Sequence, residues 1–137
     1  MTTHDVTIVG GGCVGLSVAK HLAERTDLDI AVLEKEYHLA EHQSGRNSGV
    51  LHPGFNYPPE SEKARFATEG TKRMKEYCAT HGIPCEELGV LVVATSDAEE
   101  ARLGDLADQA EANGVKYELL DSQAAIHEYE PHASGQA

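Results

Sequence analysis

The sequence has no long apolar run, few cysteines and few basic residues among its 137 positions. No stretch approaches the ~20 apolar residues of a membrane-spanning helix, and no signal-peptide pattern precedes the first predicted strand. The cysteines Cys13, Cys78 and Cys85 form no CxxC pair and leave an odd count, which suits a reducing cytoplasm better than a disulfide framework. We therefore expect a cytoplasmic protein without a transmembrane segment, and peripheral membrane contact stays open.

Basic residues are outnumbered: 11 Lys and Arg face 23 Asp and Glu, for a formal net charge of −12. Binding to nucleic acid requires a basic face that neutralises phosphates, so nucleic acid is not an expected partner. The acidic excess is concentrated in residues 97–130, on predicted surface helices. It indicates either an ordinary solvated surface or adaptation to a salty cytoplasm.

Three glycines near the start of the chain carry its strongest motif. Gly10, Gly12 and Gly15 fit G-x-G-x-x-G between an apolar strand at residues 5–9 and a helix at 13–25. In this motif the second glycine lets a pyrophosphate approach the backbone, and the third lets the helix lie against the sheet. The helix N-terminus then directs N–H groups at the phosphates. Any glycine-rich turn can match this pattern, but the flanking strand and helix make it specific.

Glu34 stands at the end of a second apolar strand, residues 30–34, and 34 − 15 = 19 positions beyond the last motif glycine. A carboxylate at this distance accepts hydrogen bonds from the adenosine ribose of a bound dinucleotide. The alternative is a solvated glutamate at a strand end. The register of strand, glycines, helix, strand and acid favours dinucleotide binding.

A long polar loop, residues 35–57, follows the second strand, and a loop of this length in a compact domain is usually functional. Only two strands fit a doubly wound sheet, so we interpret the chain as the N-terminal part of a longer protein. The alternative is a complete small domain. Beyond the loop, periodicity and capping signals predict helices at 59–80, 97–112 and 122–128 and strands at 88–94 and 117–120.

The glycine unit and the run from His42 to Tyr57 resemble the D-amino-acid-oxidase-like superfamily of FAD-dependent oxidoreductases. Within it, the part Asn-Ser-Gly-Val-Leu-His-Pro-Gly-Phe-Asn-Tyr is similar to the L-2-hydroxyglutarate oxidase/dehydrogenase family. The resemblance covers nearly all of this chain but only the front part of that family's enzyme. It implies an incomplete α/β fold, with a Rossmann-like FAD-binding βαβ portion at residues 1–82 and the start of an α+β substrate domain at 83–137.

The resemblance also implies an FAD-dependent enzyme that oxidises a small 2-hydroxy acid, L-2-hydroxyglutarate to 2-oxoglutarate. The C2 hydride passes to the flavin and a base takes the hydroxyl proton. Alternatives are an oxidase of the same superfamily acting on an amino acid or glycerol 3-phosphate, and a non-catalytic truncated FAD-binding fragment. An NAD-dependent dehydrogenase fits less well, because a strand–helix alternation should then continue after residue 34. The electron acceptor, oxygen or quinone, and covalent flavin attachment stay open.

His52 is the one catalytic candidate that the resemblance implies, as a flavin contact or proton acceptor. Arg46 is implied at a phosphate or at a substrate carboxylate, and most substrate-binding residues are expected beyond residue 137. His38 and His42 are four residues apart but have no third ligand, so no metal site is expected. The implied cofactor-binding residues are Gly10, Gly12, Cys13, Val14, Gly15, Glu34, Lys35, Ser44, Arg46, Asn47, Ser48, Gly49 and His52.

The isolated chain is expected to be inactive and to hold no stoichiometric FAD. A parallel strand is normally covered on both faces and paired at both edges, and the strands at 5–9 and 30–34 have too few predicted neighbours. Unpaired edges and exposed valine and isoleucine side chains favour aggregation over a preformed site.

Overall fold

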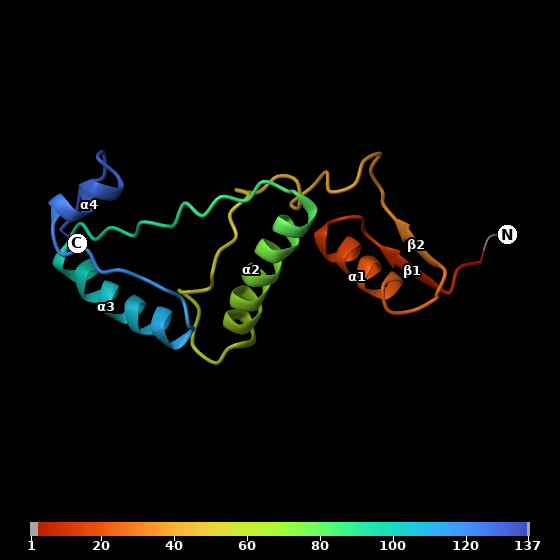
Figure 1. Cartoon of the computed structure of the whole chain (residues 1–137), viewed down its shortest axis with the longest axis horizontal. Helices are drawn as coiled ribbons and strands as arrows, with labels where there is room; N and C mark the ends of the chain where they lie inside the picture. The colour runs from red at the N-terminus through yellow and green to blue at the C-terminus, as the bar shows by residue number, and fades with distance from the viewer. Residues whose placement is uncertain (1–2, 137) are drawn as a thin grey trace. The chain divides into compact units, whose positions relative to one another are not determined.

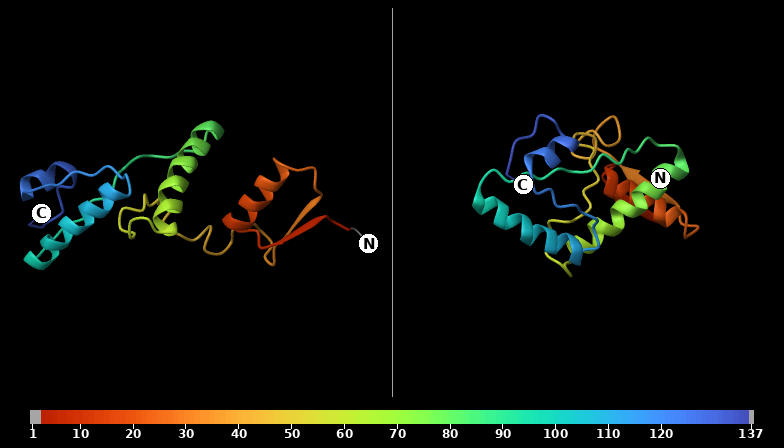
Figure 2. Two further views of the ribbon diagram at one scale, coloured as in Figure 1. Left: turned by 90° about the horizontal axis from the view of Figure 1, so that it is seen from below. Right: turned by 60° about the vertical axis from the view of Figure 1, so that its left-hand side comes forward.

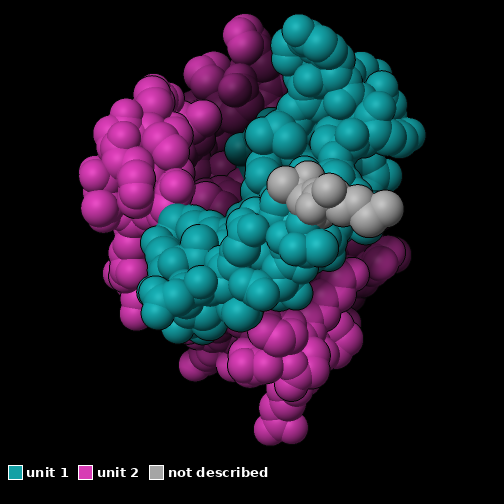
Figure 3. All heavy atoms as spheres, turned by 90° about the vertical axis from the view of Figure 1, so that its right-hand side faces the viewer, with its two compact units in different colours: residues 1–50 teal, residues 51–137 magenta. Residues whose placement is uncertain are grey.

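The computed structural model describes residues 3–136 and contains two strands and four helices over that range. The chain divides into two compact units, residues 1–50 and 51–137, which Figure 3 draws in teal and magenta. Each is described by itself below. The predicted domain boundary after residue 82 stays a prediction. In chain order the elements are β1 (Val6–Val9), α1 (Cys13–Ala23), β2 (Ile30–Leu33), α2 (Glu62–His81), α3 (Asp97–Ala112) and α4 (Gln123–Tyr129) (Figure 1).

The first unit is a single βαβ element, as the sequence predicts. β1 and β2 pair in parallel, with Val6 opposite Ile30 and Val9 opposite Leu33. α1 forms the crossover between the strands and contacts both of them. At the entry to the sheet, the Asp5 carboxylate accepts a hydrogen bond from the Asp29 N–H at 2.9 Å. The two strands therefore start in a fixed register.

This two-stranded sheet leaves much of its apolar surface uncovered. The side chains of Val9 and Leu33 are 85% and 56% exposed, and Val14 of α1 is 74% exposed. Parallel sheets are normally buried on both faces by helices and flanked by further strands. The first unit is thus the front part of a Rossmann-like sheet, in agreement with the expectation of an incomplete α/β fold.

The second unit contains the long helix α2, whose limits follow from its caps. The Ser61 hydroxyl accepts a hydrogen bond from the Ala64 N–H at 3.1 Å and starts the helix. The predicted start at Pro59 is three residues too early, because the capping residue is Ser61 and the helix begins at Glu62. The helix ends at Gly82, which has φ +66° and so adopts the left-handed conformation. The predicted end is confirmed.

The predicted strands at 88–94 and 117–120 are wrong within this chain. Both stretches belong to no sheet among residues 3–136, and Figure 2 draws them as open trace between helices. An apolar stretch becomes a strand only when a second strand pairs with its N–H and C=O groups. The helix predictions hold: α3 buries Ala107 and Ala110, and α4 buries Ile126. No helix in the described part of the chain is long and apolar enough to cross a membrane.

Candidate cofactor-binding site

The three motif glycines form a turn that no other residue type would allow. Gly10 has φ +108°, a conformation that side chains disfavour. α1 starts directly after Gly12, its N-cap residue, which offers no side-chain hydrogen bond. A Cβ atom on Gly15 would lie 1.9 Å from the carbonyl oxygen of Gly10. The first turn of α1 therefore lies directly against the end of β1, the close helix–strand packing that the motif predicts.

The N-terminus of α1 presents free hydrogen-bond donors. The Cys13 N–H donates to Ser44 Oγ at 2.9 Å, so a serine from the following loop caps the helix. The N–H groups of Gly12, Val14 and Gly15 have no partner among residues 3–136. Unpaired N–H groups at a helix N-terminus, together with its positive dipole end, suit an anion. These residues fit the pyrophosphate of a dinucleotide.

Glu34 lies beside this turn and is held by two backbone donors. Its Oε2 accepts from the Gly11 N–H at 2.7 Å and its Oε1 from the Glu36 N–H at 3.0 Å. These bonds, the Glu36 one first, lower the pKa of the Glu34 carboxyl below its ordinary value. The carboxylate is thus ionised at neutral pH. Each oxygen keeps a second lone pair, so the group can still accept a ribose hydroxyl.

The loop after β2 returns to the glycine turn and packs on it. The Ala40 N–H donates to the Gly11 carbonyl at 3.0 Å, and a Cβ on Gly11 would lie 2.6 Å from Leu39 Cδ2. Within the loop, His42 Nε2 lies 2.8 Å from Glu36 Oε1, and this contact lowers the pKa of the Glu36 carboxyl. Hydrogen bonds and side-chain packing therefore join the loop after β2 to the glycine turn inside the first unit.

Among the other predicted cofactor-binding residues of this unit, Asn47 uses its side chain for hydrogen bonds within the loop. Its amide donates to the carbonyls of Gln43 and Ser44 at 2.8 and 2.9 Å, and its oxygen accepts from the Gly49 N–H at 2.8 Å. This is a side-chain-stabilised turn. Lys35, Arg46 and Ser48 are exposed and lie outside the hydrogen bonds of the glycine turn.

His52 belongs to the second unit and is described with it. Its backbone carbonyl accepts a hydrogen bond from Thr71 Oγ1 of α2 at 3.0 Å. The imidazole is exposed and has no hydrogen-bond partner among residues 3–136. The backbone is therefore anchored and the ring is free. The roles predicted for His52 and for the cofactor-binding residues stay predictions.

Three residues around the turn were not singled out from the sequence: Gly11, Leu39 and Ala40. Gly11 offered a signal, because it lies between two motif glycines and makes three glycines consecutive. The contacts above show that its N–H binds Glu34 and that it has no room for a side chain. Leu39 and Ala40 offered none, since only the fold of the loop places them on Gly11.

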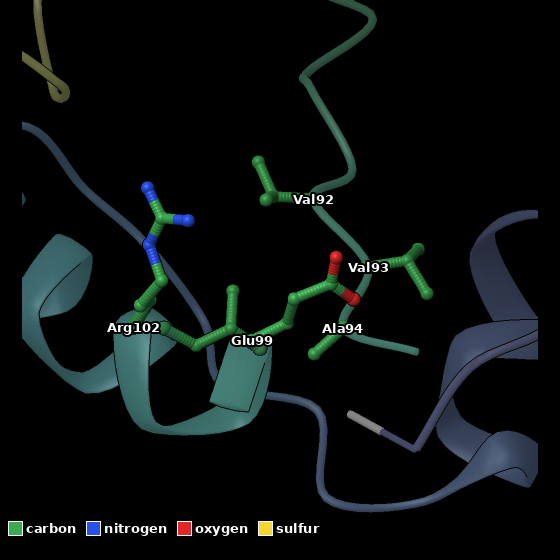
Figure 4. A pocket seen from close by; sticks show the side chains of 6 residues that line it. Val92, Val93, Ala94, Glu99 and Arg102 are labelled. Carbon is green, nitrogen blue, oxygen red and sulfur yellow. The ribbon is translucent and has the colours of Figure 1, made fainter. Parts of the chain in front are cut away.

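The second unit also has an open pocket of about 210 Å³ next to the start of α3. Figure 4 shows Arg102 and Glu99 on the helix side and Val92 to Ala94 on the extended segment. The Glu99 carboxylate is engaged there by the N–H and hydroxyl of Thr95, at 2.8 and 2.7 Å. None of the predicted site residues lines this pocket. Among the described residues, no group of three or more His, Cys, Asp and Glu could hold a metal ion.

Comparison with known proteins supports a flavin cofactor. The family model DAO, described as "FAD dependent oxidoreductase", matches residues 5–137. Among solved structures, the chain is similar to the dithionite-reduced L-alpha-glycerophosphate oxidase from Mycoplasma pneumoniae with FAD bound. The TM-score is 0.78 and the identity 31%, over 96% of this chain and 35% of that one.

Curated relatives are similar over almost the whole chain. The mitochondrial L-2-hydroxyglutarate dehydrogenase of Nematostella vectensis is 44% identical over 133 residues, 96% of this chain and 29% of that protein. The human enzyme of the same name is 44% identical over 98% of this chain and 29% of its own length. The L-2-hydroxyglutarate dehydrogenase of Escherichia coli (strain K12) is 41% identical over 96% and 31%. The chain thus spans about a third of the length of these relatives.

Proposed function

Because the chain belongs to the DAO family of FAD-dependent oxidoreductases, we propose that it is the FAD-binding front part of an enzyme that oxidises L-2-hydroxyglutarate. The proposed FAD cofactor is supported by one observation in the structure. The glycine turn presents the free N–H groups of Gly12, Val14 and Gly15 beside the ionised Glu34 carboxylate. This pairing of anion site and ribose acceptor is what a dinucleotide needs.

The substrate assignment is supported by the relatives, which are 41–44% identical over almost the whole chain and share one name. When bound, FAD supplies the acceptor for the hydride of the substrate's C2–H bond. Gly12 and Val14 bind the pyrophosphate, and Glu34 binds the ribose. His52 is the proposed acceptor of the hydroxyl proton, because an imidazole nitrogen can act as a general base. The cytoplasmic location remains part of the proposal and is supported by the cysteine pattern.

Anaerobic reduction of the flavin in the full-length protein tests this proposal. The protein should purify with oxidised FAD, and L-2-hydroxyglutarate should bleach the flavin absorbance. The D enantiomer, glycerol 3-phosphate and a panel of amino acids should leave it unchanged. Absence of flavin, after reconstitution with FAD has also been attempted, would refute the cofactor assignment.

Glycerol 3-phosphate is the second candidate substrate, because the similar solved structure is a glycerophosphate oxidase. The same measurement separates the two substrates. Bleaching by glycerol 3-phosphate and not by L-2-hydroxyglutarate would keep the FAD site and replace the substrate.

A further inference from the structure

Asn113, directly after α3, uses its side chain on a distant loop. Its Nδ2 donates to the carbonyl of Gly54 at 3.0 Å and to the carbonyl of Tyr57 at 2.9 Å. These partners lie 59 and 56 positions earlier in the sequence, and both hydrogen bonds are partly buried. One side-chain amide thus satisfies two carbonyls of a single turn, residues 54–57.

The backbone at this position does not require asparagine. Asn113 has φ −86° and ψ 1°, a conformation open to most residue types, and the left-handed position after the helix is taken by Gly114 with φ +68°. Its contribution to ending α3 is made by its own backbone N–H, which donates to the Gln109 carbonyl at 3.0 Å. The side chain is therefore free for the turn.

α2 holds the same turn from another side. The Tyr57 N–H closes the turn on the Gly54 carbonyl at 3.2 Å. Gly54 is buried, and a Cβ atom there would lie 2.9 Å from the Cβ of Ala67 in α2. Lys63 of α2 lies over the Tyr57 ring, with its Nζ 4.4 Å from the centroid. The turn has little space in which to shift.

Only Pro53 separates His52 from the 54–57 turn, and the backbone of His52 is fixed as well. Thr71 Oγ1 of α2 donates to the His52 carbonyl at 3.0 Å. The segment 52–57 is thus bonded to α2 at its start and to Asn113 at its end. The exposed imidazole projects from a backbone that is held at both ends.

We propose that Asn113 is a positioning residue, which fixes the 54–57 turn and through it the place of the His52 imidazole in the reaction. This inference rests on the proposed function, which gives His52 its contact with flavin or substrate. The reason lies in the direction of these hydrogen bonds. The carbonyl oxygens of Gly54 and Tyr57 both accept from the Asn113 NH₂ group, and a side-chain oxygen in place of that nitrogen would repel both carbonyls.

The test replaces the amide by an isosteric carboxylate in the full-length protein. Asn113→Asp keeps the shape but removes both N–H donors. Gln123→Glu is the matched control. Gln123 makes the same kind of clamp on another segment, donating to the Ala133 carbonyl at 2.8 Å and accepting from the Gly135 N–H at 2.9 Å. Both side chains are half-buried in the same unit.

Asn113→Asp should speed amide exchange in residues 52–57 and change the visible circular dichroism of the bound flavin. It should also lower kcat for L-2-hydroxyglutarate by up to about a hundredfold, the order of effect of a reacting group misplaced by about 1 Å. FAD affinity should change less than about twofold, because the phosphate turn lies elsewhere in the chain. Asn113→Gln keeps both donors on a longer side chain and should recover part of kcat. Gln123→Glu should leave kcat and the flavin spectrum unchanged.

Equal losses of kcat in Asn113→Asp and Gln123→Glu would overturn the inference, since they would indicate general destabilisation. An unchanged kcat and flavin spectrum in Asn113→Asp would overturn it as well. Should that variant not fold, Asn113→Ala removes the donors without adding charge and is judged by the same comparison. A wild-type protein that binds no FAD or oxidises no 2-hydroxy acid would instead refute the proposed function.

Discussion

β2 and the extended segment 88–94 have similar sequences and different structures. Ile30–Leu33 reads Ile-Ala-Val-Leu and forms a strand, whereas residues 90–93 read Val-Leu-Val-Val and form none. β2 has β1 as a parallel partner over four residue pairs. The segment 88–94 has no partner strand among residues 3–136, and Leu88 is 85% exposed. Apolar, β-branched composition makes a strand possible, but a hydrogen-bonding neighbour makes it form.

The largest expected effect comes from adding a methyl group at Gly15, in the βαβ unit that contains β2. Gly15→Ala should abolish detectable FAD binding, a loss of more than about a hundredfold, because its Cβ would meet the Gly10 carbonyl oxygen at 1.9 Å. Flavin fluorescence titration of the full-length protein measures it. Affinity within a few-fold of wild type would show that α1 can move away from the turn without harm.

The segment 88–94, which forms no strand here, can be tested in the full-length protein, where a partner strand can be present. Amides of residues 88–94 should exchange at least about a hundredfold more slowly in the full-length protein than in residues 1–137 alone. In contrast, residues 30–33 should be protected both in the full-length protein and in the fraction of residues 1–137 that stays soluble, because β1 is present in both. Hydrogen exchange with mass spectrometry makes the comparison. Equally fast exchange of 88–94 in both proteins would mean that a missing partner is not the reason.

In the proposed function, Glu34 follows the end of β2 and binds the ribose of the cofactor. Glu34→Gln should weaken FAD binding by roughly tenfold to a hundredfold, the range for a hydrogen bond to a charged group. Gln also places an NH₂ group against one of the backbone donors, Gly11 N–H or Glu36 N–H. Flavin titration measures the change, with Glu41→Gln in the same loop as the control. Unchanged affinity would show that the ribose assignment is wrong.

The same carboxylate predicts a pH dependence. Its folded-state pKa is lowered by the Glu36 and Gly11 N–H groups. The stability it contributes is therefore present above the unfolded carboxyl pKa and is lost as pH falls through the lower folded value. Thermal unfolding midpoints from about pH 7 to about pH 3 should fall less steeply in Glu34→Gln than in wild type. Parallel curves for the two proteins would contradict this.

The smallest expected effect is a gain in stability, and it comes from a substitution in the second unit. A Cβ on Gly104 of α3 would meet nothing within 4 Å. Gly104→Ala should therefore raise the free energy of unfolding by about 0.5–1 kcal/mol, the difference in helix propensity. Paired with Gly15→Ala, it is the same substitution in another helix. Denaturant unfolding measures it, and a loss of stability would show that α3 packs on something absent from residues 3–136.

Local signals in the sequence determined the βαβ unit, the C-terminal ends of α2 and α3, and the family. Each depends on neighbours within a few residues: a glycine that permits a positive φ, a serine that caps, an apolar period. The position of Glu34 beside the glycine turn could be predicted for a related reason, since the motif sets its distance from Gly15, and the ribose-acceptor role proposed for it follows from that distance. In contrast, a strand at 88–94 could not be decided locally, because its hydrogen-bond partner lies elsewhere.

Only the tertiary structure decided which side chains hold the turn and the loops. Ser44 caps α1 across 31 positions, and Asn113 clamps the Gly54 and Tyr57 carbonyls across more than 50. From the sequence, Ser44 was only an implied cofactor-binding residue, and Asn113 was only the residue that follows the helix predicted at 97–112. A side-chain hydrogen bond acts over about 3 Å, and the path of the backbone between the partners sets whether they come that close. That path depends on packing along the whole segment, so no local pattern predicts these contacts.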